Sequence, residues 1–547
     1  MRYRRVARVG LALVVTAGLG GTLITAAPAI AEEARTPLAA AEPVKLAWGK
    51  CPTGVAPGAP QLQCARVPVP LDYSEPDGRK IEIVISRLAS AKPAKRRGVL
   101  LLNPGGPGGA GLSQPADLVA LGLPATVSAA YDLIGMDPRG VGHSSPVSCG
   151  FLADDEYAAN IPPYAGNSAA VAKQAKIAKR VAAQCAANDK HGLLPHISTA
   201  NTARDLDRIR IALGEQKISF FGASYGSALG SAYASMFRER TDRIVLDSNA
   251  GTTSLDRAAV RRFGLGLELR FPDFAKFAAE RHAGYGLGRT PAEVRRNFFA
   301  LAEQLDRKPV DGIDGATFRL YMFASSYGEA RFPVMAQIWQ SLASSDDAAV
   351  RLRQRTDSRM PEVLALPGLS AGRATQGAAQ SPHDNAFSAF LAVTCNDTAW
   401  PTDVATYQRD VAKDRKRFPM FGAASANITP CAYWPRPAEP PVRITKDGPA
   451  NVLILQNLRD PATPHLGGVL LRKAFGDRAR LVSVDAGEHG VYVYDDNPCA
   501  LNLTTTYLVD GTLPRRDTFC SASTQSGLNL DAAAQRTRAA VLDRLHR

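Results

Sequence analysis

A serine framed by glycines is the first feature of the sequence that suggests chemistry. Residues 222–226 read Gly-Ala-Ser-Tyr-Gly, with Ser224 at the centre. This pattern is typical of a tight turn that presents a nucleophilic serine between a strand and a helix. With 46 glycines in 547 residues, chance alone supplies it in about a fifth of such chains. An apolar run at residues 218–221 and a helical pattern at residues 227–237 provide the required setting, so we predict Ser224 as a nucleophile.

A nucleophilic serine needs a histidine to take its proton and an acid to orient that histidine. The sequence has only eight histidines, and His489 stands in Gly-Glu-His-Gly directly after the apolar run 481–484. Asp460 lies in the loop that follows another apolar run, residues 452–456. The chain order Ser224, Asp460, His489 is the order found in α/β-hydrolases. We therefore predict these three residues as a catalytic triad.

Alternatives to two of these residues remain open. Asp247 follows the apolar run 243–246 and is the alternative acid, by the same argument from strand ends. His465 lies close to Asp460 and is the alternative base, although it stands where a helix is predicted to begin. Asp485 is interpreted as part of a local turn.

A glycine-rich loop supplies donors for the negative charge that develops during acyl transfer. Residues 103–109 read Asn-Pro-Gly-Gly-Pro-Gly-Gly, and backbone N–H groups in such a loop can approach a substrate closely. We expect the N–H of Gly105 or Gly106, together with that of Tyr225, to form an oxyanion hole. A phosphate-binding loop is disfavoured, because the pattern Gly-x4-Gly-Lys-Ser/Thr is absent and prolines remove donors.

These residues need a sheet to hold them, and the chain contains several strands that are apolar nearly throughout. Such strands are typical of buried parallel sheets. They lie at residues 99–102, Tyr131–Met136, 218–221, 243–246, 450–456 and Ala479–Val484. A hairpin is predicted at residues 65–71 and 80–89, and a helix at residues 201–214 with Thr202 as its N-cap. The alternation of strand and helix predicts an α/β fold with a mostly parallel sheet.

The alternation stops in the middle of the chain. From residue 251 to residue 445 it gives way to amphipathic segments, so a mainly helical lid is predicted there. The α/β-hydrolase core is expected to comprise residues 44–250 and 446–547. A core plus an inserted domain suits this length, because one hydrophobic core usually stops growing at about 250 to 300 residues.

The N-terminal residues 1–31 have the order of a secretory signal peptide. Arginines come first, an apolar run follows, and Ala29-Ile30-Ala31 precedes two glutamates. An uncleaved anchor is the alternative, but glycines within the run weaken it as a spanning helix. Residues 32–43 predict a flexible leader or pro-segment. We therefore expect a secreted, extracellular protein that has no stable membrane association once the signal is removed.

Eight cysteines agree with export, since disulfides form outside the cytosol. They allow about a hundred connectivities, and the sequence alone does not choose among them. Local pairing is our expectation: Cys51 with Cys64, Cys149 with Cys185, Cys395 with Cys431, and Cys499 with Cys520. Clustered pairs such as Cys-x2-Cys are missing, which disfavours a zinc site. We expect no metal and no cofactor.

The basic excess does not point to nucleic acid. The formal net charge is +14, but lysines and arginines are spread thinly and form no block interleaved with aromatic residues. A solvated basic surface is the simpler interpretation. We expect a monomer.

Together the motifs resemble a known family. Residues 103–108, 137–142, 222–226, 460–464 and 487–490 look like those of the secreted bacterial tripeptidyl aminopeptidases, relatives of proline iminopeptidase. The similarity spans residues 46–520. Asn103 stands where proline iminopeptidases usually carry a histidine, which favours the tripeptidyl branch.

This resemblance implies a serine exopeptidase that releases short peptides, typically tripeptides, from free N-termini of peptides or proteins. Such an enzyme needs carboxylates in the lid to bind the ammonium group of its substrate. Glu268 and Asp397 are our candidates. Two other activities stay open, a proline iminopeptidase-like aminopeptidase and an esterase or lipase with the same triad. A non-catalytic exported binding protein on this fold is the rival from another class.

Overall fold

The structure is a computed structural model, and it describes residues 45–545 except residues 60, 153–154, 158 and 344–380. The predicted signal peptide and leader lie outside the described residues. Within those that are described, no helix combines the length and the apolar character needed to cross a membrane.

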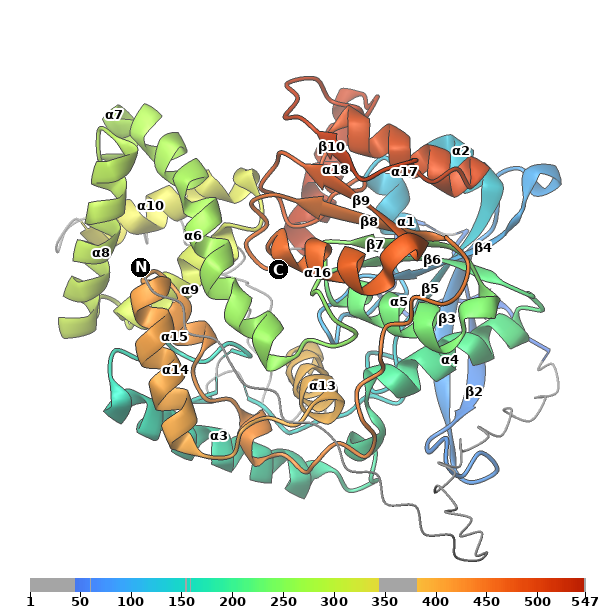
Figure 1. Cartoon of the computed structure of the whole chain (residues 1–547), viewed down its shortest axis with the longest axis horizontal. Coiled ribbons are helices and arrows are strands. Elements are labelled where there is room, and N and C mark those ends of the chain that lie inside the picture. Colours follow the sequence, from blue (N-terminus) through green and yellow to red (C-terminus); the bar gives the residue numbers. More distant parts are fainter. Residues whose placement is uncertain (1–44, 60, 153–154, 158, 344–380, 546–547) are drawn as a thin grey trace, which may run out of the picture. The chain divides into compact units, whose positions relative to one another are not determined.

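The described residues form a ten-stranded sheet (Figure 1), in the order β1-β2-β3-β5-β4-β6-β7-β8-β9-β10. The strands are β1 (Gly49–Lys50), β2 (Gln63–Pro70), β3 (Lys80–Leu88), β4 (Gly98–Asn103), β5 (Tyr131–Met136), β6 (Ile218–Ala223), β7 (Thr241–Asp247), β8 (Val452–Asn457), β9 (Ala479–Val484) and β10 (Thr518–Cys520). Pairing is antiparallel from β1 to β5 and parallel from β5 to β10. The mostly parallel sheet predicted from the apolar runs is therefore present.

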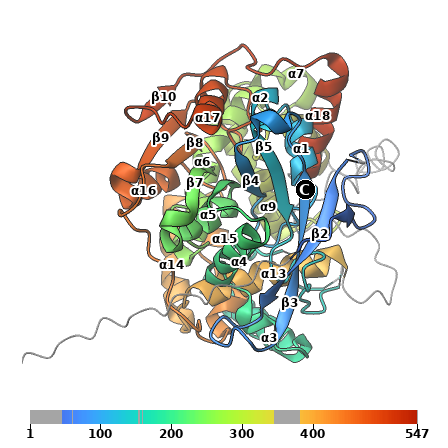
Figure 2. The same ribbon diagram turned by 90° about the vertical axis from the view of Figure 1, so that its right-hand side faces the viewer.

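Helices cover both faces of this sheet (Figure 2), and the side chains of β4 show why. Val99 and Leu101 belong to the apolar core on one face, whereas Leu100 and Leu102 belong to the core on the other. The first core includes residues of α4 (Thr199–Ala212), α5 (Tyr225–Met236) and α16 (Leu466–Phe475). The second includes residues of α1 (Gln114–Ala120), α2 (Ala125–Ala130), α17 (Pro498–Asp510) and α18 (Ala532–Leu545). Strands buried on both faces need apolar residues at successive positions.

The described residues between β7 and β8 contain helices and no strand of the sheet. The helices are α6 (Arg257–Glu280), α7 (His282–Tyr285), α8 (Pro291–Arg307), α9 (Gly315–Ser325), α10 (Phe332–Ala343), α13 (Pro382–Asp397), α14 (Val404–Arg417) and α15 (Gly422–Ser425). A further long helix, α3 (Ser168–Asn188), precedes α4.

Two helix starts differ from the prediction. Helix α4 begins earlier, because the Ser198 side chain caps it by accepting a hydrogen bond from the Asn201 N–H at 3.2 Å. The predicted cap Thr202 instead lies inside the helix and donates its hydroxyl to the Ser198 carbonyl at 2.9 Å. Helix α5 begins at Tyr225, immediately after the serine of the glycine-framed motif.

Candidate active site

Ser224 occupies the sharp turn between β6 and α5. Its backbone has φ 59° and ψ −125°, a conformation that non-glycine residues adopt only when the surroundings enforce it. The flanking glycines are required by close approach: a β-carbon on Gly222 would lie 2.3 Å from the Gly226 carbonyl oxygen, and one on Gly226 would lie 2.6 Å from the Asn103 carbonyl oxygen. Ser224 is partly exposed, while the side chain of Tyr225 is buried. The elbow thus presents one hydroxyl beside a helix N-terminus.

Strand order brings the predicted partners to the same edge of the sheet as this serine. Strands β6, β7, β8 and β9 are successive parallel neighbours, so the loops leaving their carboxyl ends lie side by side. Ser224 follows β6, Asp460 follows β8, and His489 follows β9. Asp247 is the last residue of β7, between them.

Asp460 and His489 form a close pair. The His489 Nδ1 lies 3.0 and 2.9 Å from the two carboxylate oxygens of Asp460. Asp460 is fully buried and also accepts hydrogen bonds from the N–H groups of Ala462 at 2.9 Å and Thr463 at 2.8 Å. Because a carboxylate binds a protonated Nδ1, the neutral ring keeps Nε2 free to accept a proton.

The histidine is also held by residues that the sequence analysis missed. The Thr463 hydroxyl donates to Asp460 at 2.8 Å and lies 3.4 Å from the His489 Nδ1. The backbone N–H of His489 donates to the Tyr327 carbonyl at 2.9 Å, and the two rings meet edge to face with centroids 4.9 Å apart. Tyr327 follows α9, so the region between β7 and β8 buttresses this histidine. The local sequence around Tyr327 carries no signal for that contact.

Two opposing effects act on the protonation of His489. Burial lowers the pKa of the imidazole, because charge is disfavoured away from water. The negative charge and hydrogen bond of Asp460, helped by the charge of Asp247, outweigh burial, and the pKa of His489 is raised above its ordinary value.

The structure gives the two alternatives different surroundings. Asp247 is fully buried, and its carboxylate accepts hydrogen bonds from the backbone N–H groups of Val491 at 2.9 Å and Tyr492 at 2.7 Å. Its carbonyl accepts the Ser224 N–H at 2.9 Å. Asp247 therefore joins the serine turn to the loop just beyond His489. Burial raises the pKa of Asp247 to about 7. His465 contacts the Ser483 hydroxyl at 2.8 Å.

The glycine loop after β4 adjoins the serine turn. A β-carbon on Gly105 would lie 2.5 Å from the Ala223 carbonyl oxygen and 3.1 Å from the Tyr225 nitrogen. The Gly105 N–H already donates to the Asn103 side-chain oxygen at 3.1 Å. Of the two donors that the sequence left open, Gly106 is therefore the better partner for the Tyr225 N–H. Neither of these two N–H groups donates to another of the residues that the structure describes.

The two carboxylates expected to bind a substrate ammonium are both engaged within the protein. Glu268 accepts from Arg295 at 2.7 Å and from the Met420 N–H at 2.9 Å. Asp397 is buried, with 7% exposure, and its two oxygens accept from the backbone N–H and hydroxyl of Thr199 at 2.7 and 2.5 Å. Each of the four carboxylate oxygens already accepts one hydrogen bond from within the protein, which disfavours ammonium binding by either residue. The donors of these hydrogen bonds lie far from the two carboxylates in the sequence. Their role in binding a substrate stays a prediction.

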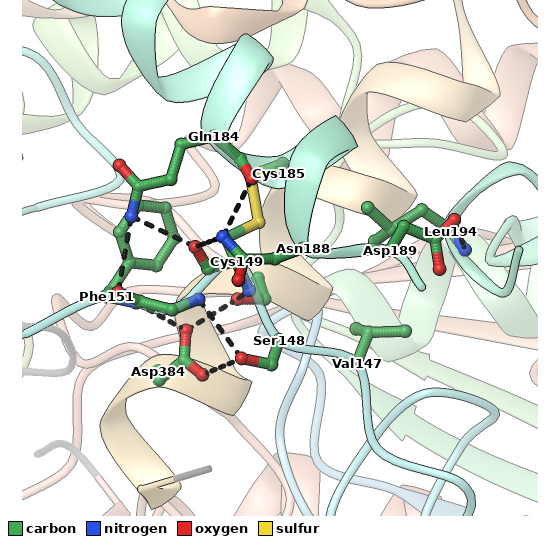
Figure 3. Close-up of a disulfide and its surroundings, with 12 residues drawn as sticks. Val147, Ser148, Cys149, Phe151, Gln184, Cys185, Asn188, Asp189, Leu194 and Asp384 are labelled. Carbon is green, nitrogen blue, oxygen red and sulfur yellow. Dashed lines mark hydrogen bonds between the residues drawn. A yellow bond between two sulfur atoms is a disulfide. The ribbon is translucent and has the colours of Figure 1, made fainter. Parts of the chain in front are cut away.

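All eight cysteines pair in the four local combinations expected from the sequence. Figure 3 shows the bridge between Cys149 and Cys185, which ties the loop after β5 to α3. On the other side of this loop, Asp384 of α13 accepts a hydrogen bond from the Phe151 N–H at 2.8 Å and one from the Ser148 hydroxyl. Four disulfides fit a protein of an oxidising compartment.

Comparison with known proteins decides the family. The chain is 34% identical over 467 residues to the tripeptidyl aminopeptidase of Streptomyces coelicolor, covering 84% of this chain and 83% of that protein. The chain belongs to the tripeptidyl aminopeptidase family. Serine protease Hip1 of Mycobacterium tuberculosis is 30% identical over 473 residues, which cover 84% of this chain and 87% of the relative. Carboxylesterase B of the same organism is 30% identical over 519 residues, which cover 92% and 96%.

The profile of the family described as TAP-like protein matches residues 418–520. This stretch contains both Asp460 and His489. As a member of the tripeptidyl aminopeptidase family with an α/β-hydrolase fold, the protein is a serine hydrolase of the peptidase type.

Proposed function

We propose that the protein is a secreted serine exopeptidase that releases short peptides, tripeptides foremost, from free N-termini. Ser224 is the nucleophile, His489 the general base and Asp460 the acid that orients it. The observation that carries this proposal is the hydrogen-bonded pair of Asp460 and His489 on the strand ends beside the strained Ser224 turn. The names of the Streptomyces and Mycobacterium relatives support peptide substrates.

The reaction begins when the His489 Nε2 takes the proton of the Ser224 hydroxyl and the serine oxygen attacks the scissile carbonyl. The N–H groups of Gly106 and Tyr225 stabilise the resulting oxyanion. Asp460 stabilises the imidazolium, in keeping with the raised pKa of His489. His489 then protonates the leaving amine, and water attacks the acyl-enzyme with His489 again as base. The N-terminal peptide leaves, and the serine hydroxyl is restored.

A panel of chromogenic peptides tests the proposal. Tripeptide anilides with a free N-terminus should be turned over by the purified protein, and the same peptides with an acetylated N-terminus should not. Ser224→Ala should abolish turnover without changing the thermal unfolding midpoint. Full activity in Ser224→Ala would refute the mechanism, and equal rates on free and acetylated peptides would refute the exopeptidase specificity.

Carboxylic ester hydrolysis is the second candidate, because a relative named Carboxylesterase B matches 92% of this chain. The same triad serves both reactions, since esters and amides pass through the same type of tetrahedral intermediate. A matched pair of substrates separates the two activities. The same N-acetylated peptide is offered once as its anilide and once as its ester, and kcat/KM is measured for each. Efficient cleavage of the acetylated ester together with no cleavage of free tripeptide anilides would favour the esterase.

A further inference from the structure

Helix α13 reaches the predicted oxyanion hole at two places. Near its start, a β-carbon on Gly108 would lie 2.8 Å from the Ala386 carbonyl oxygen, so the glycine loop rests directly on this helix. At its end, Asp397 binds Thr199, the first residue of α4. Thr199 in turn contacts Tyr225, whose backbone N–H is one of the two predicted oxyanion donors. A helix from the stretch between β7 and β8 therefore touches the surroundings of both donors.

The second of these contacts is a chain of three side chains. The Tyr225 hydroxyl lies 2.6 Å from the Thr199 Oγ1, and the Thr199 hydroxyl donates to the Asp397 Oδ2 at 2.5 Å. The other Asp397 oxygen accepts the Thr199 backbone N–H at 2.7 Å. All three residues are buried, with exposures of 4%, 2% and 7% for the tyrosine, threonine and aspartate.

Burial raises the pKa of Asp397 to about 7, so above that pH the carboxylate is ionised and counting protons gives this chain a direction. The threonine hydroxyl has one hydrogen, and an ionised Asp397 accepts it. In the hydrogen bond between the two hydroxyls, Tyr225 is then the donor and the Thr199 Oγ1 is the acceptor. The tyrosine ring is consequently anchored at its far end by a series of aligned donors that ends on a buried carboxylate. Chains of this kind strengthen each of their hydrogen bonds.

Anchoring the tyrosine ring restrains the backbone beside the nucleophile. Tyr225 is the first residue of α5 and follows Ser224, whose positive φ leaves little freedom to the next peptide. A tyrosine fixed at both its Cα and its hydroxyl cannot change its χ1 angle without moving that backbone. The Tyr225 N–H is thus held in one orientation before substrate binds. Preorganised donors of this kind stabilise a transition state more than a ground state.

We propose that Asp397 is a positioning residue of the oxyanion hole, acting through the Thr199 hydroxyl on Tyr225. The proposal rests on the proposed acyl transfer at Ser224. It gives Asp397 a role in place of the substrate contact expected from the sequence, without contact to the reacting atoms.

The test compares two isosteric changes on the same helix. Thr199→Val removes the central hydroxyl of the chain and leaves the volume unchanged. Thr202→Val is the matched control, because its hydroxyl is equally buried on α4 but bonds only the Ser198 carbonyl. Removal of a complete oxyanion donor lowers kcat by a factor of about 100 to 1,000, so a donor that is only misaligned should lower kcat by about tenfold. We expect this loss in Thr199→Val, with KM within about twofold because ground-state contacts are kept, and an unchanged kcat in Thr202→Val.

Conservative and terminal variants complete the test. Thr199→Ser keeps the hydroxyl and should restore kcat, whereas Asp397→Asn and Tyr225→Phe should each lower kcat as Thr199→Val does. If Thr199→Val does not fold, Tyr225→Phe decides, since it removes only the terminal oxygen. Wild-type kcat in folded Thr199→Val or in Tyr225→Phe would overturn the proposal, as would an equal loss in Thr199→Ser. Loss of kcat with KM kept and serine rescue would support it.

Failure here is distinguishable from failure of the proposed function. If Ser224→Ala is inactive and Thr199→Val retains full kcat, acyl transfer at Ser224 stands and the role of Asp397 falls. If Ser224→Ala keeps its activity, the proposed function itself is refuted, whatever the result for Thr199→Val.

Discussion

Adding one methyl group at Gly105 should disable the enzyme with little effect on its fold. A β-carbon there would lie 2.5 Å from the Ala223 carbonyl oxygen, 3.0 Å from the Ser224 Cβ and 3.1 Å from the Tyr225 nitrogen. Ordinary contact begins at 3.4 Å, so the loop and the serine turn must separate by roughly 1 Å. A misplacement of about 1 Å costs on the order of 100-fold in rate, or about 2.7 kcal/mol of transition-state stabilisation.

The backbone of Gly105 also imposes a penalty that a control can isolate. Its φ is +97°, and Gly54 has φ +90° with nothing within 4 Å of an added β-carbon. Alanine in left-handed backbone costs roughly 1–2 kcal/mol. Gly54→Ala should therefore lose about that much unfolding free energy and keep its activity.

Thermal unfolding and kcat/KM on a free tripeptide anilide, measured for both variants, separate strain from catalysis. We expect a fall in kcat/KM of about 100-fold only in Gly105→Ala. A folded Gly105→Ala with wild-type kcat/KM would refute the placement of this loop in the catalytic site. Equal losses in the two variants would refute the argument from the clash.

The same geometry bears on the stability of the fold and on the pH dependence of the rate. Asp247→Asn leaves one acceptor oxygen where the aspartate uses two. The unfolding free energy should therefore fall by about 1–3 kcal/mol, as measured by calorimetry. We also expect a lower kcat in this variant, as measured by steady-state kinetics. Because the base must be neutral and the pKa of His489 is raised above 6.5, kcat/KM should rise with pH through a midpoint above that value. Asp460→Asn should lower the midpoint, and lower kcat on the order of 10,000-fold. Replacing Cys149 and Cys185 by alanine should lower the unfolding free energy by about 4 kcal/mol, measured by denaturant titration.

Each of these expectations has a contrary result. A pH midpoint at or below 6.5 in the wild-type protein would contradict the electrostatic effect of Asp460. Unchanged unfolding of Asp247→Asn would mean that the contacts at residues 491–492 do not need the carboxylate. For the disulfide, the Cys51–Cys64 pair is the control, since it joins the residue just after β1 to β2 and closes a shorter loop, with a separation of 13 against 36. Its removal should cost slightly less and leave kcat unchanged.

The core of the fold and the candidate triad could be predicted because their signals are local. A strand buried on both faces is apolar residue after residue, and the loop at its carboxyl end follows directly in the sequence. The sequence pattern alone placed Asp247 and Asp460 in equivalent positions. The two residues differ in what their carboxylates bind. Asp247 accepts hydrogen bonds from backbone N–H groups, whereas Asp460 binds His489.

The sequence did not reveal the partners of the two carboxylates assigned to the lid. Asp397 was expected to bind a substrate because the family resemblance implies carboxylates that hold a free ammonium group. Its partner Thr199 is 198 positions away, and no local pattern reveals a bond over such a distance. The Asn103 side chain, by contrast, binds an N–H only two positions away, and the conformation of the loop decides that it is the N–H of Gly105 and not that of Gly106.

The position of α13 limits how this scaffold can be recombined. Hydrolases are often engineered by exchanging the segment above a common core to obtain new specificity. Here that segment includes a helix that supports both the glycine loop and the anchor of Tyr225. A chimera that receives a foreign insertion would keep the three candidate triad residues but lose both the support of the predicted oxyanion hole and the Tyr327 contacts of His489. Grafts that retain both residues 382–397 and Tyr327, which contacts His489, should preserve turnover, so specificity in this scaffold is best redesigned around these supports rather than by replacing them.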